Sequence, residues 1–266
     1  MEPGEKIKLQ VLISTYGIEG IERLASAFHP RIEGIEYLVS WQLPDSDIPE
    51  VLTRPDFRII KNATRGLSCN RNISLETATA PVCLLSDDDV DYDEDGLKRV
   101  MDIFEENPDL DIAAFEYEGD DNKIYPEVEM DLKKTEKGYY ISSIELAFRR
   151  DVVVRSGVRF DERFGIGGRF IGGEEDIWVH GLLKKGLKGR FFPQVIAYHK
   201  GTTTGTRLAS TPEYIESKGA VFKLIYPFSW PLRMFVHALR SKKTGWRLGI
   251  HRYCREWISG VSEVSK

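Results

Sequence analysis

The sequence predicts an α/β protein built on a mostly parallel, doubly wound sheet flanked by helices, with a helical C-terminal segment. Across residues 7–117, short apolar runs typical of buried strands alternate with stretches whose apolar residues recur at helical spacing. Alternating strands and helices indicate a parallel sheet. From about residue 218 the composition changes to basic and aromatic residues, which indicates a distinct segment.

The strands of the first half are recognised by apolar runs, and its helices by apolar spacing. Residues 7–14 are expected to form the first strand, which Thr15, Tyr16 and Gly17 end. Apolar residues at helical spacing follow and indicate the first helix. Further strands are expected over residues 35–40, 57–61, 82–86 and 111–117, and further helices over 68–79 and around 97–104.

The second half is less regular. Residues 139–148 and 191–199 are expected to be extended, and residues 165–173 to form a glycine-rich loop. A short helix is expected over about 174–185, because Gly186 can end it and two lysines favour its negative end. The regular alternation is therefore confined to the first half.

Composition and charge favour a cytoplasmic protein. The chain has 266 residues, a net charge of −5 and three cysteines, Cys69, Cys83 and Cys254. The negative charge gives no reason to expect nucleic acid as a partner. The cysteines form no zinc or disulfide pattern, which favours a reducing compartment. We expect neither a signal peptide nor an apolar run of the ~18 residues that span a bilayer.

Three consecutive carboxylates, Asp87, Asp88 and Asp89, follow the apolar run 82–85. Adjacent acids repel one another unless a cation lies among them. In open α/β sheets, ligands bind beyond the carboxyl ends of the strands. The triplet therefore points to a Mg²⁺ or Mn²⁺ ion that holds a diphosphate, although a solvated acidic turn explains it equally well.

Two further groups of residues could carry chemistry. Glu174, Glu175 and Asp176 open the helix after the glycine-rich loop, where the helix dipole keeps a carboxylate ionised. Such a carboxylate can act as a general base toward a hydroxyl group, but acids also favour first turns for stability alone. His199 follows a strand and can ligate a metal, although a lone histidine is more often structural.

The order of these groups resembles that of the family 2 glycosyltransferases, which have the GT-A fold. The resemblance runs from about residue 11 to about residue 207 and rests on five short motifs. They look like the opening strand with its turn, an Arg-Asn segment before a helix, the Asp-x-Asp motif, the loop before the catalytic acid, and a Glu-Asp motif. In this order they occupy residues 11–16, 66–72, 84–89, 160–165 and 173–176.

The resemblance implies an inverting transfer from a nucleotide-diphosphate sugar, with UDP as the expected nucleotide and a hexose or N-acetylhexosamine as the sugar. Asp176 would deprotonate the acceptor hydroxyl, and Glu175 would help to position the acceptor. The residues expected to contact the nucleotide sugar are Thr15, Tyr16, Gln42, Arg71, Asp87 and Asp88. Gln42 stands where the family usually has an acid that reads the base, which leaves the specificity for uracil open.

The resemblance also implies metal dependence, with Mn²⁺ or Mg²⁺ as the cofactor. Its ligands would come from Asp87, Asp88 and Asp89, and His199 matches a histidine that some relatives place near metal or pyrophosphate. Because three acids are adjacent, the register of the Asp-x-Asp motif is ambiguous. We favour Asp89 as the main ligand.

We expect a GT-A catalytic domain over residues 1–215, with a nucleotide-sugar half over about 1–118 and an acceptor half over about 119–215. Residues 216–266 would be a basic, aromatic-rich helical segment. One interpretation is peripheral contact with an anionic membrane through residues 218–257, on the inner face of the cell membrane. This fits a glycan or lipid-linked acceptor in bacterial surface polysaccharide assembly. The other interpretation is a helical appendage that packs its aromatic residues on the catalytic domain.

Two other functions compete with sugar transfer. The first is nucleotidyl transfer onto a sugar phosphate, but the turn at 15–20 has no Arg or Lys to grip a triphosphate. The second is a non-catalytic protein that binds a glycan or nucleotide sugar. Both acidic motifs are intact, so nothing in the sequence favours this binding protein.

Overall fold

The structure is a computed structural model, and it describes residues 6–119, 123–134, 140–199, 207–208, 211–240 and 249–266. The chain divides into two compact units. The first unit comprises Met1–Arg65, Cys69–Arg159 and Gly181–Gly201, and the second comprises Gly66–Ser68, Phe160–His180 and Thr202–Lys266. Each unit is described by itself.

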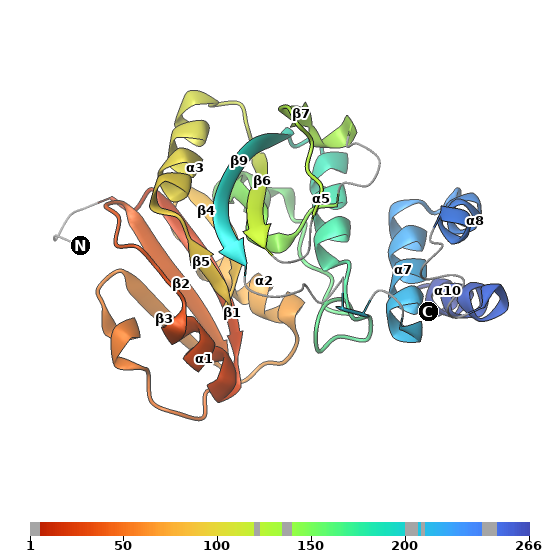
Figure 1. Cartoon of the computed structure of the whole chain (residues 1–266), viewed down its shortest axis with the longest axis horizontal. Coiled ribbons are helices and arrows are strands. Elements are labelled where there is room, and N and C mark those ends of the chain that lie inside the picture. Colours follow the sequence, from red (N-terminus) through yellow and green to blue (C-terminus); the bar gives the residue numbers. More distant parts are fainter. Residues whose placement is uncertain (1–5, 120–122, 135–139, 200–206, 209–210, 241–248) are drawn as a thin grey trace. The chain divides into compact units, whose positions relative to one another are not determined.

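A single sheet forms the centre of the first unit (Figure 1). Its N-terminal half holds four parallel strands, which are β1 (Leu9–Tyr16), β2 (Ile35–Gln42), β3 (Phe57–Asn62) and β4 (Val82–Asp87). The other strands are β5 (Val90–Tyr92), β6 (Ile112–Gly119), β7 (Met130–Asp131), β8 (Leu146–Arg149) and β9 (Gly189–His199). The strand order is β3-β2-β1-β4-β8-β6-β9-β5, and β7 pairs with β9.

Antiparallel strands enter in the second part of this sheet. β8 is antiparallel to both β4 and β6, and β5 is antiparallel to β9, whereas β6 and β9 are parallel. The expected extended run over 139–148 is shorter, and residue 139 lies outside the described residues. A capping box between Ser142 and Glu145 turns the chain into the 3-10 helix η3 (Ser143–Glu145) before β8 begins.

Four helices lie where the sequence predicts them, and the helix over residues 150–156 was not predicted. The first unit contains α1 (Gly17–Ser26), α3 (Glu94–Glu106) and α4 (Arg150–Ser156), with the short 3-10 helices η1 (Glu50–Thr53) and η2 (Leu132–Lys134). Helices α2 (Leu67–Thr77) and α5 (Glu174–Lys184) each carry residues of both units. The second unit also contains α7 (Pro212–Ile225), α8 (Trp230–Arg240) and α10 (Ile250–Val264).

The core of the first unit follows directly from the apolar runs. Every residue of β2 is buried, as are all residues of β1 but the last. Tyr37, Trp41 and Phe115 are fully buried in this core. Because strands covered on both faces read as continuous apolar runs, this burial explains why the first strands are recognisable in the sequence.

The second unit has its own small core between α7 and α10. Tyr253 and Trp257 of α10 are fully buried there with Ile215 of α7. At Gly219 and Gly260 a β-carbon would collide with the backbone of the partner helix. Glycine at these two positions therefore allows the helix backbones to approach closely. The helical C-terminal segment is confirmed, although Lys242, Lys243, Trp246 and Arg247 lie outside the described residues.

Membrane-spanning character is absent from the helices that the structure describes. None of them is both long enough and apolar enough to cross a bilayer.

Candidate active site

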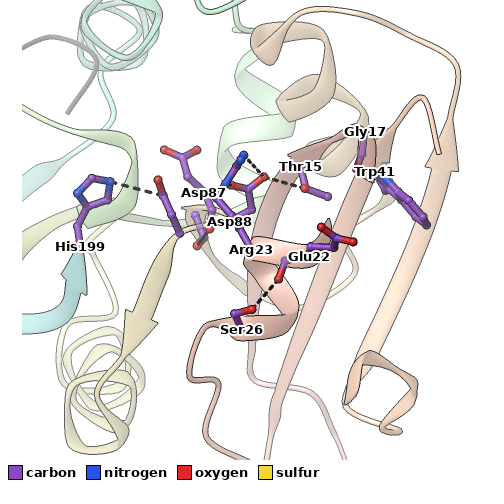
Figure 2. Close-up of polar contacts among 11 residues, drawn as sticks. Thr15, Gly17, Glu22, Arg23, Ser26, Trp41, Asp87, Asp88 and His199 are labelled. Carbon is purple, nitrogen blue, oxygen red and sulfur yellow. Dashed lines mark hydrogen bonds and ion pairs between the residues drawn. The ribbon is translucent and has the colours of Figure 1, made fainter. Parts of the chain in front are cut away.

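The carboxyl ends of β1 and β4 bring the first group of expected site residues together. These strands are parallel neighbours, with Ser14 in register with Asp87. Thr15 and Tyr16 at the end of β1 therefore lie beside the acidic triplet that follows β4. Figure 2 shows Thr15, Asp87 and Asp88 at this edge.

Each carboxylate of the triplet has a different partner. Asp87 accepts a hydrogen bond of 3.1 Å from Arg71 Nη2. Asp88 accepts one of 2.7 Å from the Thr15 hydroxyl and two, of 3.0 and 3.2 Å, from Arg23 (Figure 2). These contacts offset much of the repulsion expected among adjacent acids.

Asp89 lies near the end of β9. Its Oδ1 lies 3.5 Å from Nε2 of His199, the last residue of β9. The pairing of Val90 with His199 between β5 and β9 fixes this approach. The triplet therefore spreads its charges over partners from β1, α1, α2 and β9.

The environments of Asp88 and Asp89 affect their pKa values in opposite directions. Burial raises the pKa of Asp88 to about 6, against the hydrogen bonds from Thr15 and Arg23. Burial also acts to raise the pKa of Asp89, but the hydrogen bond and charge of His199 and the charge of Arg23 bring it below its ordinary value. Asp89 is thus the more readily ionised of the two, and its side chain is 40% exposed.

Arg23 is a site residue that the sequence prediction missed. It lies on α1, one helical turn after Gly20, where a β-carbon would come within 2.7 Å of Asp88 Oδ2. Glycine at position 20 therefore leaves room for the contact of Asp88 with Thr15. Nothing in the local sequence distinguishes Arg23 from a solvated helix residue, because its partner is far away along the chain.

The Arg-Asn segment connects α2 to the strand ends. Asn70 accepts a 2.5 Å hydrogen bond from the Ser40 hydroxyl and donates one of 2.8 Å to the Ser40 carbonyl. Arg71 is almost fully buried and reaches Asp87. Asn70 thus anchors the helix, and Arg71 presents its guanidinium group to the acidic triplet.

Gln42 and Tyr16 end neighbouring strands in register. Gln42 is buried and donates a 2.8 Å hydrogen bond to the Thr64 hydroxyl, whereas Tyr16 is half exposed. Next to them, the Trp41 indole donates to the Gly17 carbonyl (Figure 2). These two side chains, both expected to contact the nucleotide sugar, therefore lie at the same edge as the triplet.

The second unit holds the Glu-Asp motif at the start of α5. Glu174 is buried, Glu175 is partly buried and Asp176 is exposed. Gly165 has a left-handed backbone with a φ of 94°. A β-carbon added at this position would lie only 3.2 Å from the carboxyl carbon of Glu174. The glycine-rich loop is thus packed against the first turn of α5.

Helix α7 holds the same loop in place. Arg169 forms two hydrogen bonds of 2.8 and 2.9 Å with Glu216, and the Ile171 amide donates to the Ser217 hydroxyl at 2.9 Å. Phe160 stacks on Trp178 of α5 with the ring centroids 4.5 Å apart. The second unit therefore presents Asp176 on a supported loop and helix.

Few side chains in the candidate site could ligate a metal ion. Among the residues that the structure describes, no group of three or more His, Cys, Asp or Glu side chains converges as a metal site. Asp89 and His199 do offer one oxygen and one nitrogen that point toward each other. Two protein ligands suffice for an ion that takes its remaining ligands from phosphate and water.

Comparisons with known proteins agree with the resemblance noted in the sequence. The family model described as glycosyl transferase family 2 matches residues 46–163. No curated protein matches the chain significantly.

Solved structures of TarS from S. aureus share the fold. One TarS structure matches with a TM-score of 0.65 and 16% identity, covering 97% of this chain but only 48% of TarS. TarS 1-349 in complex with UDP-GlcNAc gives a TM-score of 0.65 at 15% identity and covers 97% of this chain and 80% of the other. The complex with UDP gives 0.59 at 15% identity, with 96% and 81% covered. The GT-A fold is confirmed by these structures, and the family match over residues 46–163 supports the resemblance to the family 2 glycosyltransferases.

Proposed function

We propose that the chain transfers N-acetylglucosamine from UDP-GlcNAc to a hydroxyl group of a glycan or lipid-linked acceptor, with inversion, in bacterial surface polysaccharide biosynthesis. The observation that carries this proposal is the meeting of Thr15, Tyr16 and the acidic triplet at one carboxyl edge. Ligands of open α/β sheets bind beyond that edge. The TarS complexes with UDP-GlcNAc and UDP support the choice of donor.

The proposal includes Mn²⁺ or Mg²⁺, held by Asp89 and His199. Their donor atoms are 3.5 Å apart, and carboxylate and imidazole donors both suit such divalent ions. When bound, the ion would act as a Lewis acid and offset the negative charge on the departing diphosphate. Asp87 and Asp88 are held by Arg71, Arg23 and Thr15, so their role is to position the ribose and the diphosphate.

The nucleotide would lie against the ends of β1 and β2. Tyr16 is half exposed and can contact the base, while Gln42 supplies amide groups for hydrogen bonds in place of an acid. Arg71 adds a buried positive charge at the triplet. Together these side chains suit a nucleotide whose diphosphate points toward Asp89.

Asp176 would act as the general base. It is exposed in the first turn of α5, where the helix dipole favours its ionised form. In-line attack on the sugar needs one base, on the face opposite the leaving group. Glu175, the neighbouring acid, would position the acceptor hydroxyl.

A donor screen tests the proposed function. The purified chain should release UDP from UDP-GlcNAc in the presence of Mn²⁺ or Mg²⁺, and chelation of the metal should stop the release. Formation of pyrophosphate from UTP and N-acetylglucosamine 1-phosphate would contradict sugar transfer and favour nucleotidyl transfer. Turnover that is unchanged by chelation would contradict the metal.

Matched variants test the roles of single residues. Asp89→Asn and His199→Gln should lower metal-dependent turnover by about 10- to 100-fold or more. Asp95→Asn is the control, because Asp95 is an exposed acid in the same acidic stretch. Asp176→Asn should abolish transfer to an acceptor while donor binding, measured by thermal shift, persists. Full transfer by this variant would contradict its role as the base.

We also propose that the acceptor lies at the cytoplasmic face of the cell membrane and that residues 218–257 make peripheral contact there. Support comes from the excess of basic over acidic residues in this stretch. Basic and aromatic residues on helices favour anionic lipid surfaces.

A further inference from the structure

Helix α8 carries apolar side chains on its outward face. Leu232 is 67% exposed, Phe235 is 59% exposed and Leu239 is 58% exposed. Phe228 lies in the turn just before the helix and is 95% exposed. Spacings of three and four residues place the three helical members on one face.

The opposite face of α8 is also apolar, and it is already used. Ala238 is buried, and Trp230 and Met234 pack against the core that contains Tyr253 and Trp257. A helix that is apolar on both faces is normally buried on both. Among the residues of the second unit that the structure describes, the core contacts cover one face of α8 and leave the other exposed.

The stretch of sequence that contains α8 is basic and has no acid. The sequence contains no Asp or Glu between Glu216 and Glu256. The basic residues of this stretch are Lys218, Lys223, Arg233, Arg240, Lys242, Lys243, Arg247, Arg252 and Arg255. The exposed Arg233 guanidinium lies over the Tyr226 ring at 3.5 Å, next to Leu232.

A groove of about 400 Å³ runs beside the same face. Its lining combines apolar and polar side chains, namely Phe222, Ser229, Leu232, Arg233, Val236 and His237. Arg233 and Ser229 can contact a phosphate group, while Leu232 and Val236 offer apolar surface to acyl chains.

We propose that α8 is an in-plane anchor that inserts Phe228, Leu232, Phe235 and Leu239 into the headgroup region of an anionic phospholipid bilayer. This deepens the proposed function, whose acceptor lies at a membrane. The absence of acids argues for a negatively charged partner, and the row of exposed apolar side chains argues for one with an apolar interior. An anionic lipid surface satisfies both demands.

Vesicle sedimentation with the full chain tests the anchor. The protein should bind vesicles of equal parts phosphatidylcholine and phosphatidylglycerol, and bind pure phosphatidylcholine weakly. Salt at about 1 M shortens the Debye length to about 3 Å and should reduce binding. The double variant Leu232→Ser/Phe235→Ser should bind about tenfold more weakly, and Arg233→Gln about fivefold more weakly.

Phe28→Ser is the matched control, because Phe28 is 63% exposed but belongs to the first unit. Its vesicle binding should equal that of the unaltered chain. All variants should melt at the temperature of the unaltered chain, because the replaced side chains are exposed.

Three results would overturn the anchor. They are no binding to the anionic vesicles, an equal loss in Phe28→Ser, or a dimer in sedimentation equilibrium that the double variant abolishes, which would assign the face to a second copy. UDP-GlcNAc turnover without vesicles should be unchanged in the double variant. If the chain binds vesicles but does not turn over UDP-GlcNAc, the proposed function is contradicted, whereas the membrane anchor is still supported.

Discussion

Replacement of Lys123 by methionine should strongly destabilise the first unit. Lys123 Nζ lies 2.7 and 2.8 Å from the two carboxylate oxygens of Glu145, and both side chains are almost completely buried. The Lys123 ammonium group also lies 4.4–5.2 Å from the ring centroids of Tyr117, Tyr125 and Tyr140. The pair therefore has no access to water that could replace a lost partner.

The magnitude follows from what the substitution leaves behind. Removing one partner of a buried ion pair costs about 3–5 kcal/mol, because the other charge stays buried. Burial raises the pKa of Glu145 even though Lys123, Ser142 and Tyr125 stabilise its carboxylate. In Lys123→Met the carboxyl group should take up a proton, which limits the loss to the lower end, about 3 kcal/mol.

Urea unfolding followed by circular dichroism measures this loss. The control is Lys98→Met, because Lys98 and Glu94 also form an ion pair of 2.7 Å, but an exposed one. Its loss should stay below about 1 kcal/mol. The double variant Lys123→Met/Glu145→Gln should be more stable than Lys123→Met, since it contains no unpaired buried acid. Two results would refute this prediction. One is that Lys123→Met loses no more free energy of unfolding than Lys98→Met, and the other is that the double variant is less stable than Lys123→Met.

The pH dependence provides an independent check on the same pair. An acid whose pKa is higher in the folded than in the unfolded state makes the folded state bind more protons between the two values. Stability then falls as the pH rises through that range. Lys123→Met should therefore lose more stability at neutral pH than at mildly acidic pH.

Three further predictions concern other sites. Gly20→Ala places a methyl group 2.7 Å from Asp88 Oδ2, so UDP-GlcNAc turnover should fall about tenfold or more, while helix propensity offsets part of any loss in stability. Burial lowers the pKa of His29 from 6.5 to about 4. The free energy of unfolding should therefore fall as the pH drops from 6.5 to 4. In urea titrations, His29→Phe should reduce this fall by up to about 3 kcal/mol. Gly260→Ala would collide with the backbone of α7 and should lower the melting temperature by several degrees, whereas Ser262→Ala on the exposed side of α10 should not.

The parallel strands β1, β2 and β4 were predictable because they are buried on both faces. Such strands contain continuous apolar runs, which give way to polar residues just before β1 ends at Tyr16 and β4 ends at Asp87. The antiparallel strands β5 and β7 were not predicted. They are only two or three residues long, and they are set by pairing with β9, which a local pattern does not reveal.

In the candidate site, too, residues in local sequence motifs were predicted and residues that depend on long-range contacts were not. Motif order pointed to Thr15 and the acidic triplet, which lie at strand ends, and to Arg71, which lies in the Arg-Asn segment of α2. Arg23 was missed because its role depends on a contact with Asp88 that spans 65 positions. The aromatic residues of the C-terminal segment also divide in a way that composition cannot show, since Trp257 is buried and Phe228 is exposed.

The hydrogen-bond partners of Asp88 and Asp89 help to decide which of them would be the main metal ligand. For Asp88 to ligate a metal, it would have to give up hydrogen bonds from Thr15 and Arg23 and ionise in a buried setting that raises its pKa to about 6. Asp89 is partly exposed, its pKa is below the ordinary value, and its neighbour His199 is itself a possible ligand. An ion between Asp89 and His199 would therefore displace the fewest existing contacts. Asp88 would instead fix the end of β4 to β1 and α1, and in this way hold Asp89 at the edge of the sheet where the diphosphate is proposed to bind.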